Sequence, residues 1–83
     1  MRAALFLVFV SFLPAVSHAD NRQLAKEAVR DGSRLYDLAD YKSALEAFRK
    51  AYFNYEEPSF LFNIAQCHRQ LGNTADALKF YRM

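Results

Sequence analysis

Apolar and polar side chains alternate with a helical period along the chain after residue 19. An apolar position recurs every third or fourth residue, as on one face of a helix, and charged residues fill the positions between. The expected first face carries Leu24, Ala28, Leu35 and Leu38, and the second carries Tyr41, Ala44, Leu45, Phe48, Ala51 and Tyr52. The third carries Phe60, Leu61, Ile64, Ala65, Cys67, His68 and Leu71. The pattern therefore predicts an all-α fold of four helices, the last over residues 74–83.

The expected helices are separated by residues that favour free helix ends and chain reversal. The residues suited to the N-cap position are Asp20 or Asn21, Asp40 and Asn73. Pro58 fits the first position of the third helix, because its missing N–H would have no partner there. Gly72 is suited to the left-handed backbone conformation that often follows a helix end. These residues predict helix boundaries near positions 40, 58 and 73.

The chain repeats itself at an offset of 33 residues. Residues 37–50 (DLADYKSALEAFRK) align with residues 70–83 (QLGNTADALKFYRM). The identical pairs are Leu38 with Leu71, Ala44 with Ala77, Leu45 with Leu78, and Arg49 with Arg82. A period of this length is typical of helical solenoids, in which each repeat is a pair of helices.

Two segments of the chain resemble the tetratricopeptide repeat. Residues 61–73 (LFNIAQCHRQLGN) are similar to the consensus of the first helix of that repeat. The first repeat would span about residues 25–57, and the second about residues 58–83, ending before its second helix is complete. The resemblance implies antiparallel helix pairs stacked as an α-solenoid, with the small residues Gly32, Ala44, Ala65 and Ala77 where helices cross. Asp31 and His68 depart from the usual residues of the motif.

The resemblance also implies a concave binding surface. Its positions are Lys26, Val29, Arg30, Ser33, Tyr36 and Asp37 in the first repeat and Ser59, Phe62, Asn63, Gln66, Arg69 and Gln70 in the second. The expected peptide-binding residues among them are Lys26, Arg30, Tyr36, Phe62, Asn63, Gln66 and Arg69. We do not expect the carboxylate clamp of some family members, because Val29 and Ser33 replace two of its residues. The alternative is that Lys26, Arg30 and Arg69 form a solvated face that binds no ligand.

Residues 1–19 have the pattern of a secretory signal peptide. A positive start at Arg2 precedes an apolar run from Ala3 to Leu13, and the small residues Ser17 and Ala19 follow Pro14. A membrane-spanning helix needs about 20 apolar residues, and this run is about half as long. The sequence therefore predicts export and cleavage after Ala19, so that the mature chain is periplasmic or secreted. An uncleaved membrane anchor is the alternative.

Composition argues against several kinds of chemistry. After residue 19 the chain has ten Lys and Arg residues and nine Asp and Glu residues, a balance unsuited to strong electrostatic binding of nucleic acid. A single Cys allows neither an internal disulfide nor a multi-cysteine metal site. Cys67 and His68 are neighbours on one helix and so point about 100° apart, which does not suit a catalytic pair. We expect no catalytic residue, no metal and no cofactor.

These observations favour a non-enzymatic protein–protein interaction module of an exported or envelope protein. One alternative is the docking arm of a larger enzyme or membrane receptor whose active part lies beyond residue 83, and another is a structural oligomeriser. We expect the chain to be an N-terminal fragment or to self-associate through its last helix. That helix would present Leu78, Phe80 and Tyr81 with no following repeat to cover them.

The leader pattern generates a prediction about processing. Mass spectrometry of the exported protein should identify Asp20 as its N-terminal residue, because signal peptidase requires the small residues Ser17 and Ala19. A membrane-bound protein that retains Met1 would instead support the uncleaved anchor.

Overall fold

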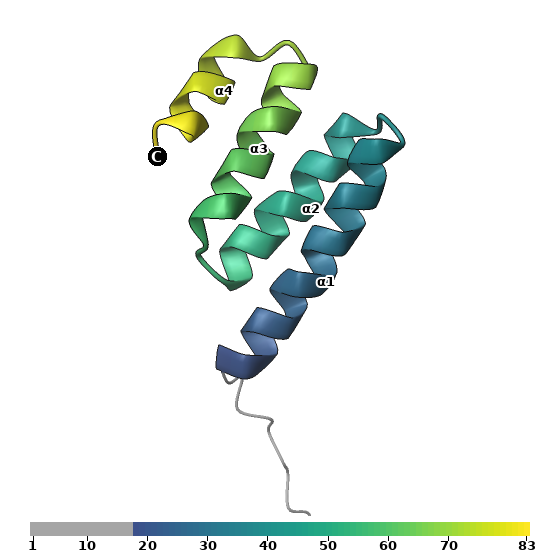
Figure 1. The fold of residues 1–83 in the computed structure, drawn as a ribbon, viewed down its shortest axis with the longest axis vertical. Coiled ribbons are helices and arrows are strands. Elements are labelled where there is room, and N and C mark those ends of the chain that lie inside the picture. Colours follow the sequence, from purple (N-terminus) through teal and green to yellow (C-terminus); the bar gives the residue numbers. More distant parts are fainter. Residues whose placement is uncertain (1–17) are drawn as a thin grey trace, which may run out of the picture.

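The computed structural model describes residues 18–83, which form four helices. They are α1 (His18–Asp37), α2 (Tyr41–Asn54), α3 (Pro58–Gln70) and α4 (Thr74–Tyr81). Consecutive helices run in opposite directions, and each packs on the next one in the chain (Figure 1). The predicted all-α fold is confirmed for this part of the chain, which contains no strand.

The predicted signal peptide, residues 1–19, lies almost entirely outside the described residues, and its cleavage stays a prediction. Helix α1 begins at His18, so the expected start at Asp20 or Asn21 is wrong. Asp20 instead lies in the first turn, where a negative charge interacts favourably with the helix dipole. Within residues 18–83, no helix has both the length and the apolar character needed to cross a membrane.

The α1–α2 and α3–α4 turns have the same backbone structure. Ala39 and Gly72 both have positive φ angles, of 62° and 81°. One residue later, the Asp40 N–H donates to the Leu35 carbonyl (2.9 Å), and the Asn73 N–H donates to the His68 carbonyl (2.8 Å). The 33-residue offset found in the sequence therefore also relates the two turns in space.

Three predicted helix boundaries are confirmed, although one capping interaction is absent. Asp40 caps α2, because its Oδ1 accepts a hydrogen bond from the Ser43 N–H (3.3 Å). Pro58 begins α3, as predicted. Asn73 occupies the N-cap position of α4, but its side chain makes no capping bond there. Its Nδ2 instead lies 3.3 Å from Nδ1 of His68, so the side chain stabilises the turn from the α3 side.

Small residues bring α1 close to α2. Ala25, Ala28 and Gly32 are buried along α1, and Ala44 and Ala51 are buried along α2. The predicted α1 face was partly wrong, because Leu24 is 41% exposed and Leu38 is 71% exposed. The spacing of these leucines is that of a buried helix face. The interface of α1 with α2 is instead formed by smaller side chains, which allow the two helices to approach more closely.

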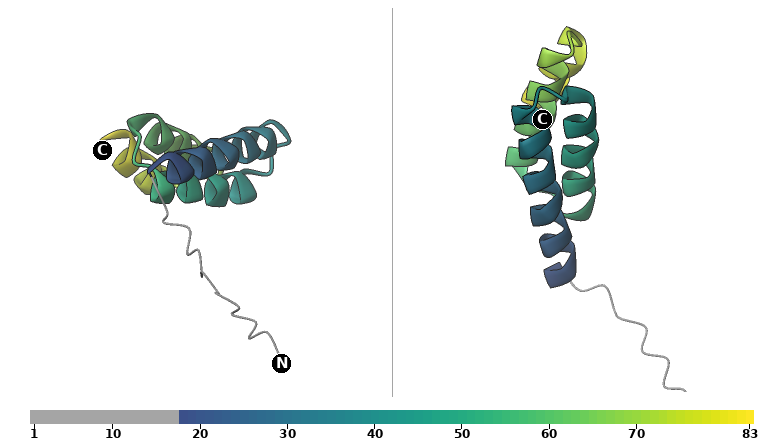
Figure 2. Two further views of the ribbon diagram at one scale, coloured as in Figure 1. Left: turned by 90° about the horizontal axis from the view of Figure 1, so that it is seen from below. Right: turned by 90° about the vertical axis from the view of Figure 1, so that its right-hand side faces the viewer.

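The core has two adjoining parts. Toward α4, the larger part is formed by Ala44, Leu45, Phe48, Leu61, Ile64 and Cys67. The smaller part, near the α2–α3 turn, is formed by Ala25, Ala28, Ala51 and Phe60. Ala65 and Ala77, which we expected at helix crossings, are also buried. The side view in Figure 2 shows α1 and α3 toward one side of the array and α2 toward the other.

The position of Gly32 generates a prediction about stability. A Cβ atom added there would lie 2.8 Å from the nearest atom of the Phe48 ring, and that ring is buried among core side chains. Gly32→Ala should therefore destabilise the protein by about 1–3 kcal/mol, although alanine is the better helix former. Chemical denaturation measures the effect.

Ser33→Ala is the matched control, since Ser33 is the next residue of the same helix and its side chain is exposed. It should leave stability unchanged or raise it slightly. An increase in stability for both variants would show that α1 and α2 are farther apart than described.

Candidate functional site

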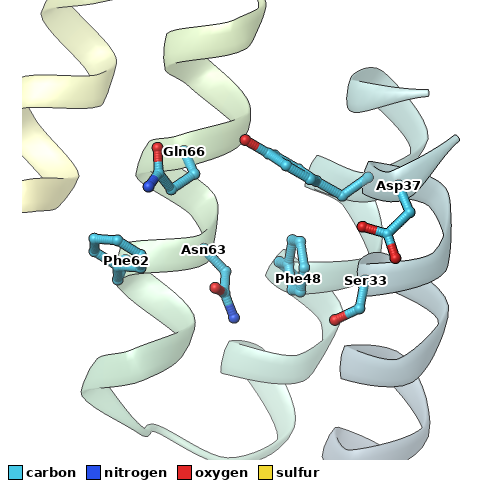
Figure 3. Close-up of a pocket in the computed structure, with 7 residues that line it drawn as sticks. Ser33, Asp37, Phe48, Phe62, Asn63 and Gln66 are labelled. Carbon is cyan, nitrogen blue, oxygen red and sulfur yellow. The ribbon is translucent and has the colours of Figure 1, made fainter. Parts of the chain in front are cut away.

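A hollow of about 230 Å³ opens between α1 and α3. Its lining residues are Ser33, Tyr36 and Asp37 from α1, Phe48 from α2, and Phe62, Asn63 and Gln66 from α3 (Figure 3). We call this the main hollow. The Phe48 ring is almost fully buried and forms its floor, whereas the walls carry hydroxyl, amide and carboxylate groups. An apolar floor between polar walls is typical of a site that binds part of a peptide or a small molecule.

Helical spacing places the wall residues together. Ser33, Tyr36 and Asp37 are three and four residues apart, so they share one face of α1. Phe62, Asn63 and Gln66 share one face of α3 in the same way. The two faces meet because both helices pack against α2 between them, which is how side chains about 30 residues apart come to line one hollow.

Hydrogen bonds to neighbouring helices fix part of the wall. The Gln70 amide donates to the Tyr36 hydroxyl (3.2 Å), which links α3 to α1 across the groove. The Tyr81 hydroxyl donates to Gln66 Oε1 (2.8 Å), and the Tyr81 ring packs edge-on against Phe62 with centroids 5.8 Å apart. The orientation of Phe62 and Gln66 therefore depends on α4.

Other polar groups of the main hollow have no partner among the described residues. The side chains of Ser33, Asp37 and Asn63 make no hydrogen bond or ion pair there. The Asn63 amide offers both a donor and an acceptor, which is the combination that matches a peptide backbone. The walls are thus available to bind the main chain of a ligand whose apolar side chain contacts Phe48 and Phe62.

A second hollow of about 210 Å³ lies nearer the start of α1 and α3. It is lined by Lys26, Val29 and Arg30 from α1, together with Glu57 and Phe60 at the start of α3. We call this the basic hollow. Arg22 lines an adjoining hollow of about 390 Å³ that shares Lys26, Glu57 and Phe60 with the basic hollow. Its side chain is fixed, since its Nη2 donates to the Tyr55 hydroxyl (3.1 Å) and its guanidinium lies 5.0 Å from the centre of the Tyr55 ring.

The structure divides the predicted peptide-binding residues into three groups. Tyr36, Phe62, Asn63 and Gln66 line the main hollow, and Lys26 and Arg30 line the basic hollow. Arg69 lines neither and instead donates from Nη1 to Gln66 Oε1 (3.5 Å). Six of the seven residues therefore lie at two neighbouring hollows on one side of the molecule.

Sequence reasoning missed several residues of these hollows. Phe48 was expected only as core packing, because its helical stripe gives no sign that one edge of the ring faces a hollow. Glu57, which directly precedes Pro58, was not assigned to a site, and Phe60 was expected mainly as core packing. Their position beside Lys26 and Arg30 depends on the packing of α3 against α1 and α2, which no local pattern reveals.

The exposed end of α4 differs in one respect from expectation. Leu78 is 47% exposed and Tyr81 is 41% exposed, as expected for an uncovered helix face. Phe80, however, is half-buried and packs against the larger part of the core. Its ring stacks on His68 with centroids 5.4 Å apart and an angle of 13° between the planes. Self-association through this helix stays a prediction.

Cys67 and His68 are both buried and do not interact with each other. Burial raises the pKa of the Cys67 thiol from 9.0 to about 11, which keeps it protonated near neutral pH. His68 faces Asn73 and Phe80, and its Nε2 has no hydrogen-bond partner among the described residues. The described residues contain no group of three or more His, Cys, Asp or Glu side chains placed to hold a metal ion.

Comparisons of the chain with family models, with curated proteins and with solved structures find no match.

The raised pKa of Cys67 generates a prediction about reactivity. At pH 8, a rise from 9.0 to about 11 lowers the thiolate fraction about a hundredfold, and the thiolate is the reactive form. Native protein should therefore react with Ellman's reagent at least a hundredfold more slowly than protein unfolded in urea. Stopped-flow absorbance gives both rates, and a native rate within tenfold of the unfolded rate would contradict the burial of Cys67.

Proposed function

We propose that this chain is a tetratricopeptide-type helical-repeat module that binds a peptide segment of another protein in the groove between α1 and α3. The observation that carries the proposal is the main hollow. Six of its seven lining residues occupy positions that the sequence resemblance assigns to a concave binding surface, namely Ser33, Tyr36, Asp37, Phe62, Asn63 and Gln66.

The repeated turn supports the repeat type. Ala39 takes a positive φ, as Gly72 does 33 residues later, although a Cβ atom makes this conformation costly. Non-glycine residues hold such a conformation only where the surrounding structure requires it. The same turn geometry is thus imposed on two different sequences, as expected when two repeats share one helix-pair architecture.

A binding role without catalysis fits the chemistry of the groove. The side chains of the main hollow carry amides, two hydroxyls, a carboxylate and aromatic rings, which bind main-chain groups and apolar side chains. Cys67, the best nucleophile in principle, is buried in the core as a protonated thiol. We also propose, from the signal-peptide pattern of residues 1–19, that this module acts in the periplasm or outside the cell.

Selection from a random peptide display library against the full chain tests the proposal. Selected peptides should bind less tightly by at least tenfold when Phe62 is changed to alanine, because a half-exposed aromatic side chain in a groove typically makes a large contribution to binding. Fluorescence anisotropy measures the affinities, and NMR chemical-shift changes should centre on Ser33, Asn63 and Gln66.

Phe53→Ala is the matched control. Phe53 is 90% exposed on α2 and lines neither hollow, so its loss should leave peptide affinity unchanged. Peptides that bind equally well to the Phe62→Ala variant, or that shift only the exposed residues of α4, would contradict a groove between α1 and α3.

A further inference from the structure

We infer that the peptide bound by this groove is acidic at one end, with carboxylates that pair with Lys26 and Arg30 while an aromatic or other apolar side chain enters the main hollow. The inference rests on the proposed function and adds the chemical class of the ligand. Three observations carry it: a row of like charges, the absence of partners for two of them, and the distance between the two hollows.

Arg22, Lys26 and Arg30 form a row of cations on one face of α1. They are four residues apart, so successive side chains lie one above the other on the helix surface. Like charges at this spacing repel one another and destabilise a helix. A row of this kind therefore lowers the stability of α1, and a bound anion is the simplest physical means of offsetting the repulsion between the three cations.

Lys26 and Arg30 have no ion-pair partner among the described residues. The two ion pairs there join Arg34 with Asp31 and Arg49 with Glu46. Glu57 lines the basic hollow but pairs with neither cation, so a single carboxylate faces three positive charges. Arg22 is held by Tyr55, which leaves Lys26 and Arg30 as the cations available to a ligand.

The two hollows are separated by a distance that a short peptide spans. On α1, the midpoint of Lys26 and Arg30 lies about seven residues before the middle of Ser33, Tyr36 and Asp37, which line the main hollow. At a rise of 1.5 Å per residue, this separation is about 10 Å along the helix. An extended peptide covers this distance in about three residues at 3.3 Å each. Acidic residues three positions from an aromatic residue would therefore reach both hollows at once.

The surroundings of the basic hollow favour a peptide over a membrane surface or a nucleic acid. Val29 and Phe60 give it an apolar lining, and the carboxylate of Glu57 would repel a run of closely spaced phosphates. The chain after residue 19 has a net charge of only +1, whereas binding to such polyanions depends on many positive charges. A few carboxylates on a partly apolar ligand match this site better.

Fluorescent peptides of defined sequence test the inference with the full chain. The first probe is Glu-Glu-Ala-Ala-Phe within a glycine–serine context, and its reversed sequence allows for either binding direction. Each has a matched probe with Gln in place of Glu. At low salt, at least one Glu probe should bind at least tenfold more tightly than its Gln counterpart, and the difference should shrink as salt screens the charges.

A charge-matched pair of double variants locates the effect. Lys26→Glu with Arg30→Glu should remove the preference for the Glu probe over the Gln probe. Lys42→Glu with Lys50→Glu changes the net charge by the same amount on exposed positions of α2, and should keep the preference. Circular dichroism verifies that both variants have the helicity of the parent protein.

The possible outcomes separate the inference from the proposed function. Equal binding of Glu and Gln probes, or equal loss of the preference in both double variants, would overturn the inference and leave the peptide groove intact. Failure of all probes, together with failure of the display selection, would overturn both. Binding of phosphatidylglycerol vesicles or single-stranded DNA that depends on Lys26 and Arg30, with no probe binding, would assign the cations to a polyanion instead.

Discussion

The close approach of α1 to α2 is the contact on which the rest of the structure depends. Gly32 lies directly against the Phe48 ring, where even a methyl group would be within 3 Å of ring carbons. Ala25, Ala28, Ala44 and Ala51 continue this contact along both helices. Because small side chains leave space between the helices, the large Phe48 ring can pack densely there, beside Gly32.

That same contact creates the candidate site. Phe48 fills the space beside Gly32, and one edge of its ring also forms the floor of the main hollow. Helix α3 then supplies the opposite wall, and α4 fixes the orientation of that wall through the hydrogen bond from Tyr81 to Gln66 and the contact of Tyr81 with Phe62. A change in the α1–α2 packing or in the position of α4 should therefore alter the groove without touching its polar residues.

Three helix boundaries could be read from the sequence because they depend on local chemistry, whereas the start of α1 at His18 and the end of α4 at Tyr81 differ from the expected positions. Asp40, Pro58 and Gly72 act through their own backbone and side-chain preferences, and all three have the expected roles. The face that α1 buries could not be read in this way, since leucine and alanine both recur at helical spacing. Which set faces α2 depends on how closely the two helices approach, and this favours the alanines and Gly32 over Leu24 and Leu38.

The sequence by itself determined the four helices, their order, the 33-residue offset, and the candidate residues Tyr36, Phe62, Asn63 and Gln66. Only the tertiary structure decided that these residues meet over Phe48, that Lys26 and Arg30 share a second hollow with Glu57, and that Arg69 lies outside both. The physical reason is that periodicity fixes which side chains share one helix face. The distance between faces of different helices is set by the sizes of the side chains packed between them.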